Sequence, residues 1–136
     1  MSTPKKKILI VDDDLAMLKL LRRALSTRYE LVVAPTSYDM EIMVNHFEPD
    51  LIIMDLRLGD HNGADVCRGI RKRAEYDRIG ILILSGLDEP RVAAAAIWGG
   101  ADSFMTKPFD ITTLQSNILH VIETKAQSAN EVIFSH

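Results

Sequence analysis

The chain has 136 residues, of which 47% are hydrophobic and 26% are charged, and its net charge at pH 7 is −3. This length supports one domain with an ordinary hydrophobic core, and the negative net charge argues against nonspecific electrostatic binding of nucleic acid. The single cysteine, Cys67, excludes an intramolecular disulfide, and the short apolar runs predict neither a signal peptide nor a membrane span. We therefore expect a cytoplasmic protein without direct nucleic-acid or membrane partners.

The first half of the chain alternates apolar runs with helical patterns. Residues 8–11 are all apolar, too few for a helix and typical of a strand that is covered on both faces. An amphipathic helix follows, with Asp14 as its expected N-cap. A weaker strand is predicted at 31–34, a helical stripe at 40–47 and a second all-apolar strand at 51–54.

The second half continues this alternation. A helix is expected to start near Ala64, and a third all-apolar strand is predicted at 81–84. An alanine-rich helix at 92–98, a weaker strand at 103–106 and a clear helical stripe at 111–122 complete the pattern. Strands that alternate with helices predict an α/β fold with a five-stranded parallel sheet and helices on both faces.

The boundaries and connections of this domain can also be predicted. Residues 1–125 are expected to form the domain, and 126–136 a C-terminal tail or the start of a linker, because the periodic pattern stops near Lys125. Residues 56–59 look like a loop. A basic run is expected to be a solvated helix face, and its members are Arg68, Arg71, Lys72, Arg73 and Arg78.

Polar side chains directly follow four of the predicted strands. Asp12 and Asp13 follow the first strand, Asp55 the third, Ser85 the fourth and Lys107 the fifth. In a parallel sheet all these places lie at the carboxyl edge, where open α/β sheets bind ligands. A helix cap or a turn would explain each residue separately, but not their joint placement.

This combination of residues suits phosphoryl chemistry. Carboxylates that lie close together repel one another, and a hard divalent cation such as Mg²⁺ relieves the repulsion through oxygen ligands. No Cys or His follows these strands, so zinc or copper fits poorly. With the charge screened, a carboxylate can attack phosphorus, while Lys107 and Ser85 contact phosphate oxygens.

The joint pattern resembles the response-regulator receiver family, to which the bacterial chemotaxis receiver belongs. The resemblance runs from about Lys5 to Thr124. It rests on four motifs in order, namely 8–14 (ILIVDDD), 51–56 (LIIMDL), 81–86 (ILILSG) and 101–109 (ADSFMTKPF). It implies the flavodoxin-like receiver fold with strand order 2-1-3-4-5.

The resemblance also implies roles for the acidic residues. Asp55 would be the phosphoacceptor, taking the phosphoryl group from a phosphohistidine. Asp13 would bind Mg²⁺ directly and Asp12 through water, with Asp55 and the backbone carbonyl of Arg57 as further ligands. Arg57 and Leu87 flank the site at positions that tune phosphoryl lifetime in relatives.

Further roles concern the switch. Ser85 and Lys107 would bind the phosphoryl group, and Ser85 with Phe104 would form the coupled switch pair. Phe104 stands where many relatives have Tyr, so a hydroxyl-mediated switch is absent. The peptide bond between Lys107 and Pro108 is expected to be cis. The chain would act as a signalling domain that catalyses its own phosphorylation and dephosphorylation, rather than as an enzyme with a separate substrate.

The implied partners are a histidine kinase or a histidine phosphotransfer protein, and either a downstream protein target or an effector domain outside this sequence. A phosphorylation-dependent homodimer is also compatible with the family. Phosphorylation would switch the surface formed by the fourth helix, fifth strand and fifth helix.

Two alternatives remain open from the residues alone. Asp12 and Asp14 form an Asp-x-Asp pair after a strand, as in haloacid-dehalogenase-type phosphatases, where the first acts as nucleophile and the second as acid/base. That hypothesis leaves Asp55 without a role. A flavodoxin-like small-molecule binder is less favoured, because three aspartates after the first strand would repel an anionic cofactor.

Overall fold

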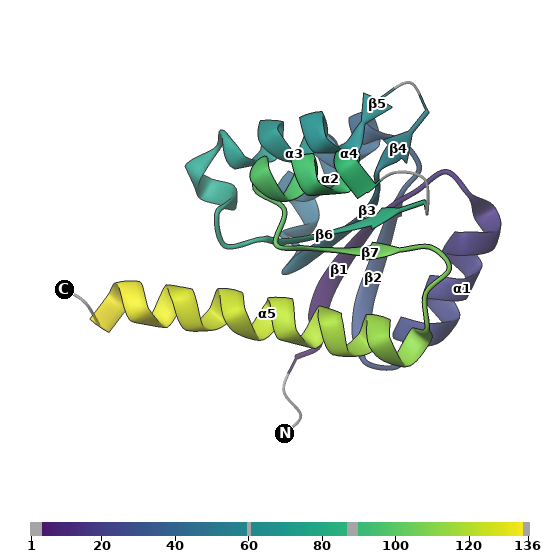
Figure 1. Ribbon diagram of the computed structural model, residues 1–136. Helices are drawn as coiled ribbons and strands as arrows, with labels where there is room; N and C mark the ends of the chain where they lie inside the picture. The colour runs from purple at the N-terminus through teal and green to yellow at the C-terminus, as the bar shows by residue number, and fades with distance from the viewer. Residues whose placement is uncertain (1–3, 60, 87–89, 135–136) are drawn as a thin grey trace.

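The computed structural model describes residues 4–59, 61–86 and 90–134, and strands alternate with helices except where β3, β4 and β5 follow one another (Figure 1). The strands are β1 Lys6–Val11, β2 Tyr29–Ala34, β3 Leu51–Asp55, β4 Arg57–Leu58, β5 His61–Asn62, β6 Gly80–Ser85 and β7 Ser103–Thr106. The helices are α1 Leu15–Leu25, α2 Ser37–Phe47, α3 Gly63–Arg71, α4 Pro90–Trp98 and α5 Ile111–Phe134, with a short 3-10 helix, η1, at Ala74–Tyr76.

The main sheet has five parallel strands in the order β2-β1-β3-β6-β7. Counted along the chain without the short β4 and β5, this is the expected order 2-1-3-4-5. The order reverses between β1 and β3, and the carboxyl ends of these two strands therefore flank the position where open α/β sheets form a ligand crevice.

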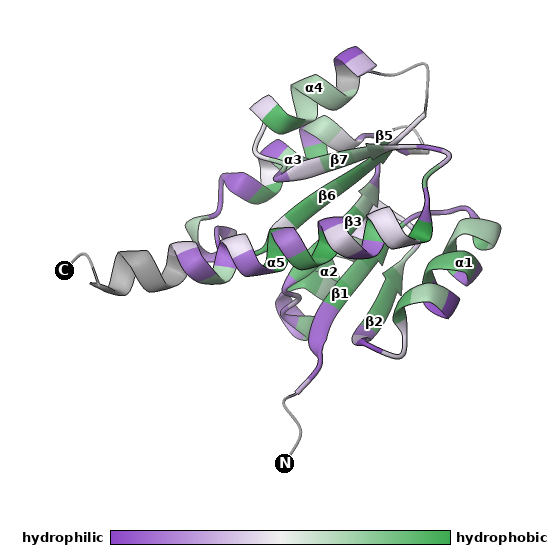
Figure 2. Ribbon diagram, turned by 60° about the horizontal axis from the view of Figure 1, so that its bottom comes forward, coloured by the Kyte–Doolittle hydropathy of each residue, from purple (hydrophilic) through white to green (hydrophobic). Residues whose placement is uncertain are grey.

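Each face of the sheet buries its own hydrophobic core, as the α/β prediction requires. Successive strand residues point to opposite faces, so the uninterrupted apolar runs supply both cores. One core lies under α2, α3 and α4, and the other under α1 and α5 (Figure 1), while Figure 2 shows β3 and β6, in the middle of the sheet, as mostly hydrophobic. In β1, for example, Leu9 and Val11 face the first core, whereas Ile8 and Ile10 face the second.

Two segments differ from the predicted pattern. The expected loop at 56–59 contains β4, which pairs with β5 in a small antiparallel hairpin, Arg57 opposite Asn62. Helix α5 continues to Phe134, past the end of its apolar stripe near Lys125, and extends beyond the body of the domain (Figure 1). The predicted domain boundary at residue 125 therefore falls inside a helix and remains a prediction.

Two further features concern one peptide bond and the length and character of the helices. The peptide bond between Lys107 and Pro108 is cis, as expected. Among the helices in the described part of the chain, none has the length and apolar character needed to cross a membrane.

Candidate functional site

Strand register brings the predicted site residues to one edge of the sheet. Val11 lies opposite Met54 across the pair β1–β3, so the next residues along the chain, Asp12 and Asp55, leave neighbouring strands at the same edge. Ser85 ends β6, opposite Thr106 of β7, and Lys107 follows directly. Four adjacent strand ends thus deliver these side chains to the carboxyl edge.

Asp55 is held from two sides. The Lys107 ammonium Nζ donates a hydrogen bond to Asp55 Oδ2 at 2.5 Å. The backbone N–H of Arg57 donates to Asp55 Oδ1 at 3.0 Å. Both side chains of the ion pair keep partial contact with solvent. The carboxylate is therefore oriented, yet reachable by a donor from outside.

Asp12 is the buried acid of the site. Only 1% of its surface is exposed, and its Oδ1 accepts a hydrogen bond from the Asp14 backbone N–H at 2.9 Å. Its Oδ2 is buried and has no hydrogen-bond partner among the described residues. Burial raises the pKa of the Asp12 carboxyl above its usual range, and the negative charge of Asp55 adds to this, while the Asp14 backbone N–H and the Lys107 charge oppose it.

The other two aspartates of the first loop are exposed and differ in their surroundings. Asp13 lies between the buried Asp12 and the start of α1, with its side chain in solvent. Asp14 is the N-cap of α1, and its Oδ1 accepts from the backbone N–H groups of Ala16 and Met17. This confirms the predicted cap, and it occupies the carboxylate that the phosphatase alternative would need as an acid/base.

The two predicted switch residues lie on neighbouring strands with opposite exposure. Ser85 is 1% exposed, and its carbonyl oxygen accepts from the Lys107 backbone N–H at 2.7 Å. Phe104, in β7 opposite Ile83, is 40% exposed. The hydroxyl-bearing residue therefore faces inward and the aromatic ring faces solvent. Leu87, the other flanking residue named above, lies outside the described residues.

The donor set at this edge fits a hard cation. In the described part of the chain, no three His, Cys, Asp or Glu side chains are arranged as a metal cage. Mg²⁺ does not require one, since it is usually bound by one or two carboxylates, with water and phosphate oxygens completing its shell. Among the described residues, Asp12 Oδ2 is a buried carboxylate oxygen without a hydrogen-bond partner, and it feels the charge of Asp55; such a group is expected to be satisfied by a cation or water.

A second polar cluster, at the opposite edge of the sheet, was not predicted. Arg71 was expected on a solvated helix face, but its side chain is only 15% exposed. Its guanidinium donates to the carbonyls of Gly100, Tyr76 and Ile79 and to Asp102 Oδ2. The prediction was wrong for Arg71 because helical spacing does not reveal that Gly100 packs against the aliphatic part of its side chain.

Other members of the basic run are paired on the surface of α3 and the turn after it. Arg68 pairs with Asp65 and Arg73 with Glu75, and all four side chains are at least half exposed. Exposed pairs of this kind contribute little to stability, because solvent screens them. They also neutralise much of the positive charge that a nucleic-acid site would need.

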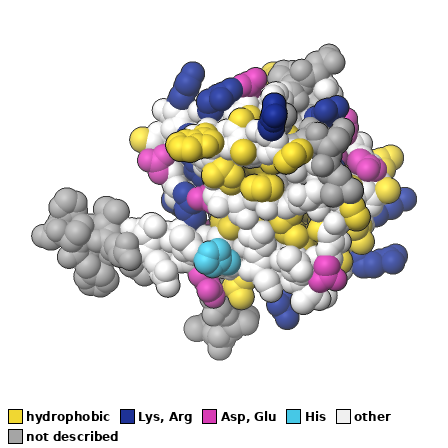
Figure 3. Space-filling view, viewed as in Figure 1, with side chains coloured by type: hydrophobic (Ala, Val, Ile, Leu, Met, Phe, Trp, Pro, Cys, Tyr) yellow, Lys and Arg dark blue, Asp and Glu magenta, His cyan; other side chains and the backbone are white. Residues whose placement is uncertain are grey.

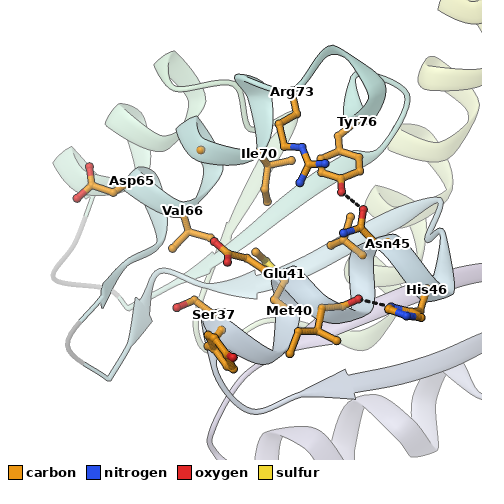
Figure 4. A pocket seen from close by; sticks show the side chains of 14 residues that line it. Ser37, Met40, Glu41, Asn45, His46, Asp65, Val66, Ile70, Arg73 and Tyr76 are labelled. Atoms are coloured by element: carbon orange, nitrogen blue, oxygen red, sulfur yellow. Dashed lines mark hydrogen bonds between the residues drawn. The ribbon is translucent and has the colours of Figure 1, made fainter.

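A cavity of about 900 Å³ lies between α2 and α3 (Figure 4). Its lining combines apolar side chains such as Met40 and Ile70 with a polar margin, where Tyr76 donates to Asn45 Oδ1. None of the residues predicted for the phosphoryl site lines it. We therefore place the candidate site at the carboxyl edge, where the buried and charged groups converge.

Comparison with known proteins shows which family the chain belongs to. The profile of the response regulator receiver domain matches residues 8–119. The transcriptional regulatory protein KdpE of Staphylococcus aureus is 33% identical over 135 residues, which cover 97% of this chain and 57% of that protein. The response regulator MprA of Mycobacterium leprae is 33% identical over 129 residues, covering 93% and 56%.

A solved structure agrees with these sequence matches. The signal receiver domain of a response regulator from Bermanella marisrubri superposes with a TM-score of 0.80 at 33% identity, covering 88% of this chain and 99% of that one. The present chain spans less than two thirds of the length of the two curated relatives. The profile match over most of the chain and the shared fold lead to one conclusion: this chain belongs to the response regulator receiver domain family, the signalling domains of two-component systems.

Proposed function

We propose that Asp55 accepts a phosphoryl group from the phosphohistidine of a histidine kinase or a histidine phosphotransfer protein, in a reaction that depends on Mg²⁺. One Asp55 carboxylate oxygen attacks phosphorus, forming a P–O bond as the P–N bond to the imidazole breaks. The leaving imidazole takes up a proton, and Asp55 becomes an acyl phosphate. Hydrolysis of that bond returns the carboxylate.

The observation that carries this proposal is the pairing at Asp55. Its carboxylate accepts from Lys107 at 2.5 Å, and the unpartnered Asp12 oxygen is buried beside it. Lys107 orients Asp55 before reaction and can pair with a phosphoryl oxygen afterwards, so one ammonium serves both states. Neither an ordinary helix cap nor a turn would place a lysine on this carboxylate.

The proposal assigns the metal ligands as the family resemblance implied them. Asp13, Asp55 and the Arg57 carbonyl would hold Mg²⁺ directly, and Asp12 would hold it through water. When bound, Mg²⁺ would neutralise the charge that builds up between the carboxylates and the incoming phosphoryl group. The buried Asp12 oxygen supports this assignment, because no described residue donates a hydrogen bond to it and a cation or water would satisfy it.

The switch would couple Asp55 to the surface of α4, β7 and α5. Ser85 would donate to the phosphoryl group, and Phe104 would turn inward from its exposed position. Helix α4 packs through small side chains, Ala93 and Ala96, so it can shift with little loss of buried area. Figure 3 shows hydrophobic side chains gathered over α4 on this face, where Trp98 is 92% exposed.

Partners and location follow from the same proposal. Since the two curated relatives are longer than this chain, the output would pass through an effector domain or through a separate protein that docks on the switching surface. A phosphorylation-dependent homodimer is a further form of that output. A cytoplasmic location, expected from the single cysteine, also belongs to the proposal.

The test is phosphoryl labelling with acetyl phosphate, a small-molecule donor. Labelling is expected with Mg²⁺ and not with EDTA, and Asp55→Asn should reduce it to background because the amide is a poor nucleophile. Label retained by the variant would contradict the assignment. Steady turnover of p-nitrophenyl phosphate by Asp55→Asn would instead support the phosphatase alternative on Asp12 and Asp14.

A further inference from the structure

We propose that Gly63, the first residue of α3, is a positioning residue for phosphorylation of Asp55. The inference rests on the proposed function and adds a part of the chain that the site residues did not include. Gly63 and Asp55 are hydrogen-bonded to opposite ends of one peptide group, the group that joins Leu56 to Arg57. A side chain at position 63 would therefore disturb the carboxylate that is phosphorylated.

The first observation is how closely the backbone at Gly63 approaches its neighbours. A Cβ atom at this position would lie 2.9 Å from Leu56 Cα, 2.9 Å from the Leu56 carbonyl oxygen and 3.1 Å from the Asp55 carbonyl oxygen. All three are backbone atoms, so no rotation of a side chain can relieve the contact. Carbon and oxygen atoms that are not bonded do not approach so closely without displacement.

The second observation is a chain of hydrogen bonds through one peptide group. The Gly63 N–H donates to the Leu56 carbonyl oxygen at 2.5 Å. The Arg57 N–H, on the other side of that peptide bond, donates to Asp55 Oδ1 at 3.0 Å. Because the peptide group is planar and rigid, a tilt at the Leu56 oxygen also tilts the Arg57 N–H.

The third observation is that neither side of this contact can move alone. Leu56 is 1% exposed, and its N–H donates to the Leu84 carbonyl oxygen of β6 at 2.8 Å. Helix α3 is fixed by the buried Ala64 and Cys67, which pack in the core under α2, α3 and α4. A methyl group at position 63 would thus be accommodated mainly by the peptide between the two, which is the one that orients Asp55.

The experiment compares three glycine-to-alanine variants of the full chain. Gly63→Ala tests the proposal. Gly69→Ala lies on the same helix, where an added Cβ meets nothing within 4 Å, and serves as the neutral control. Gly80→Ala would bring a Cβ to 2.6 Å from Val121 Cγ1, in the core and at the other edge of the sheet, so it controls for lost stability alone.

Two measurements separate positioning from stability. The first is the rate of labelling per folded molecule at saturating Mg²⁺ and acetyl phosphate, with the fraction folded taken from urea unfolding. Gly63→Ala should lower the maximal rate at least about tenfold and change the half-saturating acetyl phosphate concentration by less than about twofold, because alignment rather than binding is lost. The second is the NMR chemical shift of the Arg57 backbone amide without Mg²⁺. Among the three glycine variants, this shift should change only in Gly63→Ala.

Asn62→Ala is a milder second variant if Gly63→Ala does not fold. Asn62 Oδ1 accepts from the Ala64 N–H at 2.8 Å as the N-cap of α3, so its loss loosens the same junction without adding atoms. It should move the Arg57 resonance and slow labelling by a smaller factor.

The outcomes decide the inference in each case. Slow labelling with a moved Arg57 resonance, in the position-63 or position-62 variant only, supports it. The inference is overturned if Gly63→Ala is labelled as fast as Gly69→Ala. It is also overturned if the labelling rate per folded molecule falls by the same factor in Gly63→Ala as in Gly80→Ala. Absence of label on the unmodified chain would contradict the proposed function instead. In that case the Arg57 amide resonance alone tests whether Gly63 positions the Leu56–Arg57 peptide group. A resonance that does not move in Gly63→Ala overturns the inference.

Discussion

The two edges of the sheet both carry clustered charges, but they satisfy them to different degrees. At the amino edge, Asp102 accepts from Arg71 and from the Ile81 N–H through Oδ2, and its Oδ1 pairs with Lys125. At the carboxyl edge, Asp12 keeps a buried oxygen without a partner among the described residues. The first cluster joins α3, α5 and the start of two strands, whereas the second leaves an anionic position unsatisfied.

This difference indicates that charged residues of the same types serve stability at one edge of the sheet and function at the other. A buried polar group that has all its hydrogen bonds stabilises one conformation, and removing one partner leaves the other groups unsatisfied. A cluster that lacks a partner costs stability, and it is retained where it binds something. The amino edge should therefore be sensitive to substitution in stability, and the carboxyl edge in phosphoryl transfer.

The largest effect on stability is expected at the amino edge. Asp102→Ala should lower the free energy of unfolding by about 2–4 kcal/mol, since it removes the anionic partner of Arg71 and the acceptor for the Ile81 N–H, although partial exposure reduces the loss below that of a fully buried pair. Urea unfolding measures this change. Asp55→Ala is the matched substitution at the other edge and should cost less stability, because the loss of the Lys107 ion pair is offset by relief of the repulsion between Asp55 and Asp12. Equal losses would remove the distinction between the edges.

Gly100→Ala should sharpen the account of the amino edge. Gly100 has a φ of +116°, and an added Cβ would lie 2.4 Å from Arg71 Cγ. Backbone strain and displacement of the guanidinium together should cost about 1–3 kcal/mol. The measurement is again urea unfolding, with Gly69→Ala as control. That variant should gain about 0.5–1 kcal/mol from helix propensity, because its site is open. A neutral Gly100→Ala would show that Arg71 tolerates displacement.

The smallest effect has the opposite sign. Asp12→Asn should stabilise the metal-free protein by about 1 kcal/mol near pH 7, because it removes the charge of a buried carboxylate whose Oδ2 has no partner among the described residues. The pKa of Asp12 is raised in the folded state, so protonation favours folding. The stabilisation that the protonated Asp12 carboxyl provides is fully present below the pKa of Asp12 in the unfolded chain. It is lost as the pH rises through the raised pKa of Asp12 in the folded protein.

Unfolding in EDTA from acid to neutral pH tests this sign. The difference in stability between Asp12→Asn and the unmodified chain should grow in favour of the variant as the pH rises. Saturating Mg²⁺ should narrow the difference, since ligand binding stabilises only the chain that retains the site. A variant that is less stable than the unmodified chain in EDTA at neutral pH would show that Asp12 is satisfied by groups of the protein itself.

The hairpin and the basic run show where prediction from sequence stops. β4 and β5 have two residues each, too few to carry a periodic pattern, and they form because Gly63 brings the chain back against Leu56. The basic residues of α3 share one composition, yet Arg71 is enclosed while Arg68 and Arg73 are solvated. The partners that make this difference lie up to 31 residues away along the chain.

The amino-acid sequence by itself determined the alternation of strands and helices, because runs such as 8–11 and 81–84 must be buried on both faces. It also placed Asp12, Asp55, Ser85 and Lys107 at strand ends, since chain order is enough to locate the carboxyl edge of a parallel sheet. Only the tertiary structure decided that Asp12 is buried with no partner for Oδ2 among the described residues, and that Gly63 holds the peptide group bound to Asp55. These are contacts between segments, which depend on packing distances that local sequence patterns do not contain.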